Sequence, residues 1–246
     1  MKIKHIKTGS KGNCTYIELN NTKILIDAGV EVKKVRNELL KDEIFLKDID
    51  FIFITHLHLD HCKFIKEIQE KTNADVVILD KHYDKLGYEI NIDKLKILPT
   101  NGMMIILNDI KIFYHQGLHD DVTGVTSIFK FYYDKISYLH ITDIGILDTL
   151  LISWIKYSTN LSIEANYMLN RLKKAYPAKL VNRISSINGH LESDEVLKVL
   201  DQVKFKGKLY LIHISENAND YSEVKEYFKK FNPVVSTNDS GLLLSL

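Results

Sequence analysis

Three histidines and one aspartate stand within six residues of the sequence, in the segment THLHLDHC at positions 55–62. Imidazole nitrogens and carboxylate oxygens are the ligands that Zn²⁺ and similar divalent ions bind in proteins. His56 and His58 form a His-x-His pair whose nitrogens can reach one ion, and Asp60 and His61 follow closely enough to reach a second ion. The segment therefore predicts a site for two metal ions.

A pair of ions about 3.5 to 4 Å apart lowers the pKa of a shared water and stabilises the entering and leaving oxygens of an in-line displacement. Hydrolysis of a phosphodiester requires this arrangement, although hydrolysis of a β-lactam or a thioester can use nearly the same ligands. The segment by itself predicts a hydrolase and leaves its substrate class open.

The surrounding sequence indicates the elements that must position these residues, since short apolar runs predict strands and longer amphipathic runs predict helices. Strands are expected at 2–6, 14–19, 23–29, 51–54, 161–165, 208–214 and 241–246, with further strand-like runs between 76 and 141. Helices are expected at 30–41, 61–71, 81–87, 147–157, 167–175, 192–202 and 221–230. Strands and helices thus alternate in two similar halves, which predicts one α/β domain over 1–246, a sandwich with helices covering two inner sheets.

The composition sets limits on partners and location. Lys and Arg number 33 against 32 for Asp and Glu, so the formal charge of +1 gives no overall footprint for a long phosphate backbone. Cation-rich stretches such as KIKHIK still leave room for a local basic patch. The two cysteines, Cys14 and Cys62, suggest a reducing compartment, and no apolar run approaches a bilayer span. We expect a cytoplasmic protein with no membrane partner.

The pattern THLHLDH after an apolar strand, preceded by ILIDAG, resembles the signature of the metallo-β-lactamase fold, and the resemblance covers nearly the whole chain. It implies an αββα four-layer sandwich with the metal site at one edge of the two sheets. It also implies three further ligands, for which His119 followed by Gly124, Asp143 in YLHITDIG, and His213 in LYLIHISENAND match. His115 matches less well than His119.

The resemblance assigns one ion to His56, His58 and His119, the other to Asp60, His61 and His213, and a bridging role to Asp143. We expect two divalent ions, Zn²⁺ first and Mn²⁺ as the alternative. Asp27 resembles a carboxylate that orients a ligand imidazole, although a turn cap would explain it too. Ser10 and Asn13 are candidate phosphate contacts, although a plain β-turn fits them equally well.

His190, in NGHLESDE, matches the extra histidine that the RNase Z-like branch of the fold carries just before a helix. The resemblance implies that His190 protonates the leaving oxygen of the scissile phosphate, and Asp60 is expected to orient the nucleophile. A turn residue ahead of a helix cap is the alternative for His190. Both residues are candidate catalytic groups.

The run 161–195, which contains EAN, a basic segment and the Gly-His pair, resembles the YycJ/WalJ-like group of the fold. That group includes bacterial 5′ to 3′ DNA exonucleases and the phage anti-Pycsar phosphodiesterases. Glu164 and Asn166 lie in this run, with no role beyond local hydrogen bonding and capping. The near-neutral charge favours a small substrate over a duplex.

We therefore expect a phosphodiesterase that hydrolyses 3′,5′-cyclic mononucleotides such as cCMP, cUMP, cAMP and cGMP to 5′-monophosphates. Such an enzyme would serve phage immune evasion in the host cytoplasm. The alternative is a YycJ/WalJ-like 5′ to 3′ DNA exonuclease, and only that alternative includes a nucleic-acid partner. A thioester or lactam hydrolase and a non-catalytic metal-binding module are less favoured. Relatives in this branch imply a homodimer.

Overall fold

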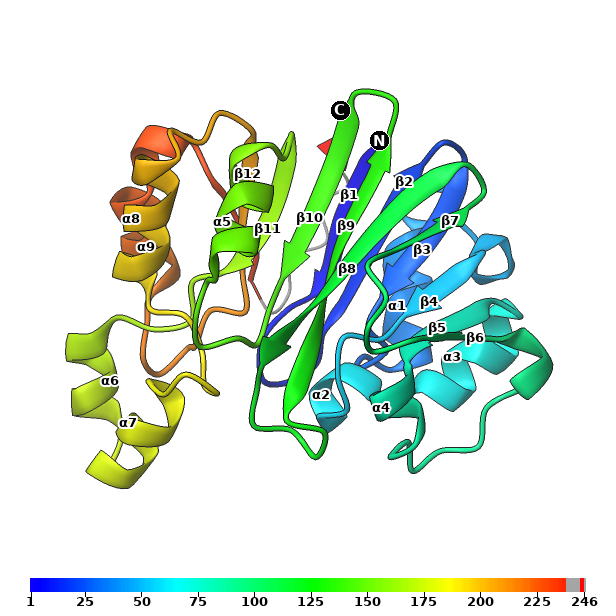
Figure 1. The fold of residues 1–246 in the computed structure, drawn as a ribbon, viewed down its shortest axis with the longest axis horizontal. Helices are drawn as coiled ribbons and strands as arrows, with labels where there is room; N and C mark the ends of the chain where they lie inside the picture. Colours follow the sequence, from blue (N-terminus) through cyan, green and yellow to red (C-terminus); the bar gives the residue numbers. More distant parts are fainter. Residues whose placement is uncertain (238–243, 246) are drawn as a thin grey trace. The chain divides into compact units, whose positions relative to one another are not determined.

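The computed structural model describes residues 1–237 and 244–245, which fold as two compact units (Figure 1). The first unit comprises Met1–Ile110, Asp121–Thr123 and the strand at 244–245, and the second comprises Lys111–Asp120 and Gly124–Thr237. That the whole chain is one domain stays a prediction. Among the described residues, no helix has the length and apolar character needed to cross a bilayer.

The sheet of the first unit has the strand order β14-β1-β2-β3-β4-β5-β6. Its strands are β1 (Lys2–Lys7), β2 (Cys14–Leu19), β3 (Thr22–Ile26), β4 (Phe51–Phe53), β5 (Asp75–Leu79), β6 (Leu95–Leu98) and β14 (Leu244–Ser245). β1 to β3 form an antiparallel meander, whereas β3 to β6 are parallel. The short strand β7 (Met104–Leu107) follows β6 in the chain. Of the strand expected at 241–246, only 244–245 lie within the described residues.

The helices of the first unit are α1 (Val32–Leu40), α2 (Leu59–Cys62), α3 (Ile65–Thr72) and α4 (Asp80–Tyr83), with 3₁₀ turns at Leu46–Asp48 and Ile92–Lys94. Val35 and Ile68 pack with the apolar strand residues in one core cluster. The single helix expected at 61–71 is wrong, because the chain forms α2 and α3 instead. The amide of Phe64 donates to the carbonyl of Ala28, which lies outside any helix, and the helical hydrogen-bond ladder stops there.

The sheet of the second unit has the strand order β13-β12-β11-β10-β9-β8. Its strands are β8 (Ile110–Leu118), β9 (Val125–Tyr133), β10 (Ile136–Ile141), β11 (Asn160–Glu164), β12 (Lys208–Ile212) and β13 (Val234–Val235). β8 to β10 are antiparallel, and β10 to β13 are parallel. Because parallel strands run in one direction, the carboxyl ends of β10, β11 and β12 share one edge of the sheet. The strand β13 was not expected from the sequence.

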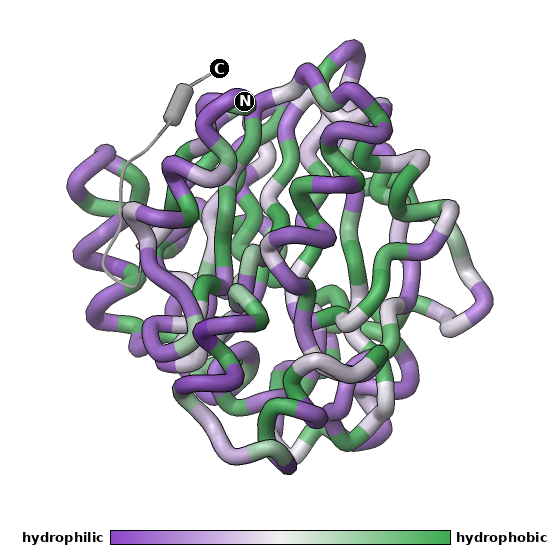
Figure 2. Tube along the Cα trace, turned by 90° about the vertical axis from the view of Figure 1, so that its left-hand side faces the viewer, coloured by the Kyte–Doolittle hydropathy of each residue, from purple (hydrophilic) through white to green (hydrophobic). Residues whose placement is uncertain are grey.

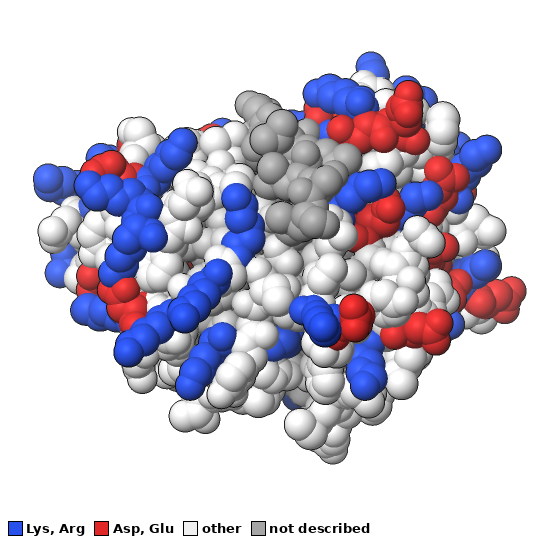
Figure 3. All heavy atoms as spheres, turned by 90° about the horizontal axis from the view of Figure 1, so that it is seen from above, with Lys and Arg blue, Asp and Glu red and all other residues white. Residues whose placement is uncertain are grey.

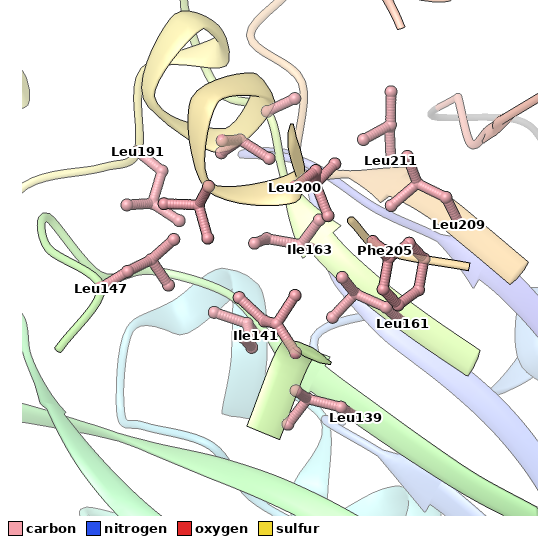
Figure 4. Close-up of a cluster of buried hydrophobic side chains, with 14 of the residues drawn as sticks. Leu139, Ile141, Leu147, Leu161, Ile163, Leu191, Leu200, Phe205, Leu209 and Leu211 are labelled. Carbon is pink, nitrogen blue, oxygen red and sulfur yellow. The ribbon is translucent and has the colours of Figure 1, made fainter. Parts of the chain in front are cut away.

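The helices of the second unit are α5 (Thr149–Lys156), α6 (Leu169–Ala175), α7 (Ala178–Ile184), α8 (Ser193–Gln202) and α9 (Tyr221–Tyr227), with a 3₁₀ turn at Lys229–Phe231. Apolar residues of α5, α8 and α9 pack on β10 to β12, as Figure 4 shows for Leu161, Ile163 and Leu200. Figure 2, drawn from the side of α8 and α9, shows hydrophilic and hydrophobic residues alternating along the helices. The sequence predicted only a basic segment where the structure has α7. This helix begins directly after Pro177, and proline is favoured at helix starts.

His5 on β1 yields a prediction about acid stability. Burial lowers the pKa of His5 from 6.5 to about 3, because the folded chain disfavours the charged imidazole. Between pH 6.5 and about 3 the unfolded chain therefore binds a proton that the folded chain does not, and falling pH destabilises the fold by roughly 3 to 5 kcal/mol in total. We expect the free energy of unfolding of the metal-free protein, measured with urea, to fall less steeply from pH 7 to 4.5 in His5→Gln. An unchanged slope would contradict the assignment to His5.

Candidate metal centre

The segment with the candidate metal ligands of the first unit follows β4, which lies between β3 and β5. His56 and His58 lie in the turn after the strand, and Asp60 and His61 lie in α2. The Nε2 atom of His56 is 3.1 Å from Nδ1 of His58, and the rings of His56 and His61 are 4.1 Å apart. Nε2 of His61 is 3.6 Å from Oδ2 of Asp60. The structure thus brings all four predicted ligands of this segment together.

This donor set fits a divalent ion of the zinc type. Two imidazole nitrogens bound to one tetrahedral Zn²⁺ lie about 3.3 Å apart, given metal to nitrogen distances of about 2.0 to 2.1 Å. The corresponding nitrogens of His56 and His58 are 3.1 Å apart. The imidazoles of His56 and His61 are fully buried, whereas Asp60 is partly exposed. Buried nitrogen donors beside an accessible carboxylate match a site that also admits water or substrate.

Asp27, directly after β3, orients this set. Its carboxylate accepts hydrogen bonds from the amide of Thr55 and its hydroxyl at 2.8 Å, and it lies 2.7 Å from Nδ1 of His61. Because Nδ1 of His61 contacts Asp27, Nε2 is the ring nitrogen that would bind a metal ion. Asp27 holds this position with a backbone φ of 66°, in the left-handed region. The structure therefore places Asp27 where an orienting carboxylate is needed.

Gly29 and Asn13 fix the backbone of the same segment. A Cβ at Gly29 would lie 1.6 Å from the carbonyl oxygen of Asp60, so only glycine permits this approach. The amide of Asn13 donates to that carbonyl at 2.7 Å, and its side-chain Nδ2 lies 2.8 Å from Nε2 of His61. Asn13, which the sequence offered as a phosphate contact, therefore lies against the candidate ligands. Ser10 is exposed nearby in the chain.

A groove of about 480 Å³ borders this segment. Asp60 lines it, together with Ser10, and four lysines contribute to its walls: Lys7, Lys11, Lys34 and Lys63. Glu31 adds the other carboxylate of the lining. The groove is therefore net basic beside a candidate metal ligand, although the whole chain is near neutral.

The second unit presents its own set at the shared carboxyl edge of β10 to β12. Donor atoms of Asp143, Glu164, His190 and His213 all lie within 4.8 Å of one another. Oδ1 of Asp143 is 3.6 Å from Nε2 of His213, 3.6 Å from Nδ1 of His190 and 3.8 Å from Nε2 of His119. The structure thus brings together the four predicted site residues of this unit, which are His119, Asp143, His190 and His213. Their carboxylate and imidazole donors also fit a divalent ion.

Glu164, at the end of β11, contacts the candidate site residues in a way that the sequence did not reveal. Its fully buried carboxylate accepts the amides of Ile144 and Leu191 at 3.0 and 3.1 Å, and its Oε2 lies 3.0 Å from Nδ1 of His190. Burial disfavours both charges, but the pairing outweighs burial, so the pKa of Glu164 is lowered and that of His190 is raised. Glu164 thereby fixes the orientation of His190.

Asn166 supports His213 in a similar way, since its Nδ2 donates to the carbonyl of His213 at 2.9 Å and lies 3.1 Å from its Nδ1. The position of EAN at the end of a strand was the available signal for both residues. His115 lies elsewhere, with Nε2 2.7 Å from Oδ2 of Asp148 at the start of α5. His140 is buried beside Tyr138.

Comparison with known proteins identifies the fold. A model of the metallo-beta-lactamase superfamily matches residues 8–127, which include the candidate ligands His56, His58, Asp60 and His61. The crystal structure of the metallo-beta-lactamase fold protein YhfI from Bacillus subtilis superposes with a TM-score of 0.73 at 16% identity, over 99% of this chain and 98% of that chain. This chain therefore has the metallo-β-lactamase fold, as predicted, and its clusters of histidine and acidic residues fit the divalent metal ions of that superfamily.

Two related proteins indicate a smaller group of homologues within this fold. Exodeoxyribonuclease WalJ of Streptococcus pneumoniae is 27% identical over 227 residues, covering 89% of this chain and 83% of its own. Exodeoxyribonuclease YycJ of Bacillus anthracis is 26% identical over 219 residues, covering 87% and 82%. The chain is thus homologous to the YycJ/WalJ exonucleases, as the sequence suggested. These relatives match the alternative prediction of a YycJ/WalJ-like DNA exonuclease. They do not show the expected closeness to anti-Pycsar phosphodiesterases.

Removal of one predicted ligand should remove metal. We expect His58→Ala and Asp60→Ala to lose at least half of the bound zinc after loading and desalting, because each substitution deletes a donor that the remaining residues cannot replace. Elemental analysis by mass spectrometry measures this content. Leu59→Ala is the matched control, since Leu59 lies between the two ligands and its side chain is 63% exposed. Full zinc content in either ligand variant would contradict the predicted assignment.

Proposed function

We propose that this chain is a metal-dependent phosphodiesterase that degrades DNA from an end, in the 5′ to 3′ direction. The observation that carries the proposal is the relationship to WalJ, which extends over 89% of the chain. Residues in both units contribute candidate groups for hydrolysis, and the fold is one that binds divalent ions. The homodimer and the cytoplasmic location expected from the sequence stay predictions.

The proposed ligands of two divalent ions, with Zn²⁺ as the expected metal, are His56, His58, Asp60, His61, His119, Asp143 and His213. This assignment rests on the sequence resemblance and on the donor chemistry within each unit. Bound divalent ions would lower the pKa of a water molecule and stabilise charge on the phosphate oxygens. Asp27 and Asn13 would hold the first set in place, and Asp60 would also orient the attacking water.

His190 is the proposed general acid. Its Nδ1 is committed to Glu164 at 3.0 Å, so Nε2 is the nitrogen that can donate a proton. As water attacks phosphorus and the bond from phosphorus to the 3′ oxygen breaks, His190 would give its proton to that oxygen. The products are a nucleotide with a free 3′ hydroxyl and a shortened strand with a 5′ phosphate. The raised pKa of His190 favours the protonated form that this step requires.

The basic groove beside Asp60 supports a polyanionic substrate. Lys7, Lys11, Lys34 and Lys63 line it, which provides the local positive charge that phosphate contacts require. The formal charge of +1 had favoured a small substrate. The formal charge is an average over the chain, whereas DNA responds to the local charge of the surface that it contacts.

Cyclic mononucleotides are the second candidate substrate. A pocket of about 250 Å³ in the second unit is lined by His190, Tyr176 and Arg183, which offer an acid, an aromatic face and a cation to a single nucleotide. Arg183 also pairs with Asp120. Hydrolysis of a 3′,5′-cyclic phosphate to a 5′-monophosphate breaks the same phosphorus to 3′ oxygen bond, so both substrates would use the same groups.

A direct comparison of substrates tests the proposal. We expect the zinc-loaded protein to release 5′-mononucleotides from linear DNA with a 5′ phosphate, and to leave a panel of 3′,5′-cyclic mononucleotides unchanged. Product chromatography measures both reactions, with His58→Ala as the inactive control. Rapid conversion of the cyclic panel with intact DNA would overturn the proposal in favour of the second candidate.

Loss of the general acid should separate binding of metal from catalysis. We expect His190→Ala to slow cleavage by about 10² to 10⁴ fold while zinc content stays at the wild-type level. A substrate whose leaving group needs no proton, such as bis(p-nitrophenyl) phosphate, should be affected far less. Loss of zinc from this variant would instead make His190 a ligand, as its place among Asp143, Glu164 and His213 also permits.

A further inference from the structure

The outer face of β8 and β9 carries a pocket that the proposed mechanism does not use. Lys111 pairs in register with Tyr132, and Phe113 pairs with Lys130, so these four side chains share one face of the sheet. α5 adds Trp154, and Tyr157 directly follows this helix. The six residues line a pocket of about 290 Å³.

The aromatic rings of this pocket are at the surface. The ring of Trp154 lies 6.3 Å from that of Phe113, inclined at 64°, which forms an edge-to-face pair. Tyr157 is 69% exposed and Tyr132 is 37% exposed, so their rings remain accessible to a planar partner. Aromatic side chains that line an open pocket are the platforms on which nucleobases stack.

The charge of the pocket is positive. Lys130 is 9% exposed, and its Nζ donates to the carbonyl of Trp154 at 3.2 Å. Nζ of Lys156 lies 5.4 Å from the ring centre of Tyr157, and Lys111 is exposed. Among the described residues that line the pocket there is no Asp or Glu. Figure 3, seen from above, shows Lys and Arg side chains gathered on the left of the view.

The pocket lies away from the candidate ligands of its own unit. Tyr132 pairs with Ser137 on β10, six residues before Asp143, which corresponds to roughly 20 Å along an extended strand. The pocket and the set around Asp143 are therefore at opposite ends of the sheet. A ligand in the pocket would not occupy that set.

We propose that this pocket binds one nucleotide of single-stranded DNA, with the base against Trp154 and Tyr157 and the phosphate near Lys111. Unstacked bases expose the faces that such rings bind, and phosphates complement a pocket lined by lysines without carboxylates. The inference rests on the proposed function, since an enzyme that acts on DNA ends meets single strands. It assigns a second contact to the DNA, outside the groove beside Asp60.

Trp154 is the single tryptophan of the chain, so its fluorescence reports on this pocket directly. The experiment titrates the metal-free protein, held in chelator so that DNA is not cleaved, with a 5′-phosphorylated oligothymidine. We expect saturable quenching that weakens as salt concentration rises, because phosphate binding releases counterions. An absence of quenching would overturn the inference.

Substitution of exposed residues tests the contacts without disturbing the core. We expect Lys111→Glu and Tyr157→Ala each to weaken binding about tenfold, through loss of a phosphate contact and of a stacking face. Lys225→Glu is the matched control, because Lys225 is an exposed lysine on α9, which does not line the pocket. Equal binding by Lys111→Glu and Lys225→Glu would overturn the inference.

Two further outcomes are distinguishable. Degradation of DNA by a protein whose Trp154 fluorescence does not respond would overturn this inference and leave the proposed function standing. Quenching without any degradation by the zinc-loaded protein would overturn the proposed function while the pocket stands. A second copy of this chain is the other possible occupant of the pocket, and sedimentation velocity tests for it. If Tyr157→Ala converts a dimer into a monomer and DNA does not bind, this face is an interface between copies, and the inference is overturned.

Discussion

A buried carboxylate that orients an imidazole organises the candidate residues of each unit. In the first unit Asp27 contacts Nδ1 of His61 at 2.7 Å, and in the second unit Glu164 lies 3.0 Å from Nδ1 of His190. Each carboxylate directly follows or ends a strand, and each accepts backbone amides that hold it in place. A buried charge is tolerated only where such partners compensate for lost hydration, so the surrounding loops must fold to supply them.

The loops that position these residues adopt an unusual backbone conformation. Asp27, Asp143 and His213 follow β3, β10 and β12, and all three have positive φ, between 50° and 66°. This left-handed region turns the chain sharply at the strand end and aims each side chain toward the edge of the sheet. Gly29 meets a related demand, since its missing side chain admits the carbonyl of Asp60. Chemistry at the strand ends therefore depends on local conformations that few residue types adopt.

Charge is arranged locally in this protein. The totals nearly cancel, yet four lysines line the groove beside Asp60, and lysines line the aromatic pocket on β8 and β9. A phosphate backbone interacts mainly with charges within about a Debye length, roughly 8 to 10 Å, so these groups matter more than the sum. A near-neutral protein can thus present locally basic surfaces.

The sequence by itself indicated the first set of candidate ligands, because His56, His58, Asp60 and His61 lie within six residues of one another. It also indicated the fold class and most of the helices and strands, since these follow from local periodicity. Only the tertiary structure decided the role of Glu164, which is 26 residues from His190. Glu164 pairs with Ile212 on β12, which directly precedes His213. Ile163, the residue before Glu164, pairs with Ile141 on β10. The pocket around Trp154 likewise joins β8, β9 and α5. Such contacts depend on which strands pair and in what register, and pairing is set by burial of the whole core rather than by neighbouring residues.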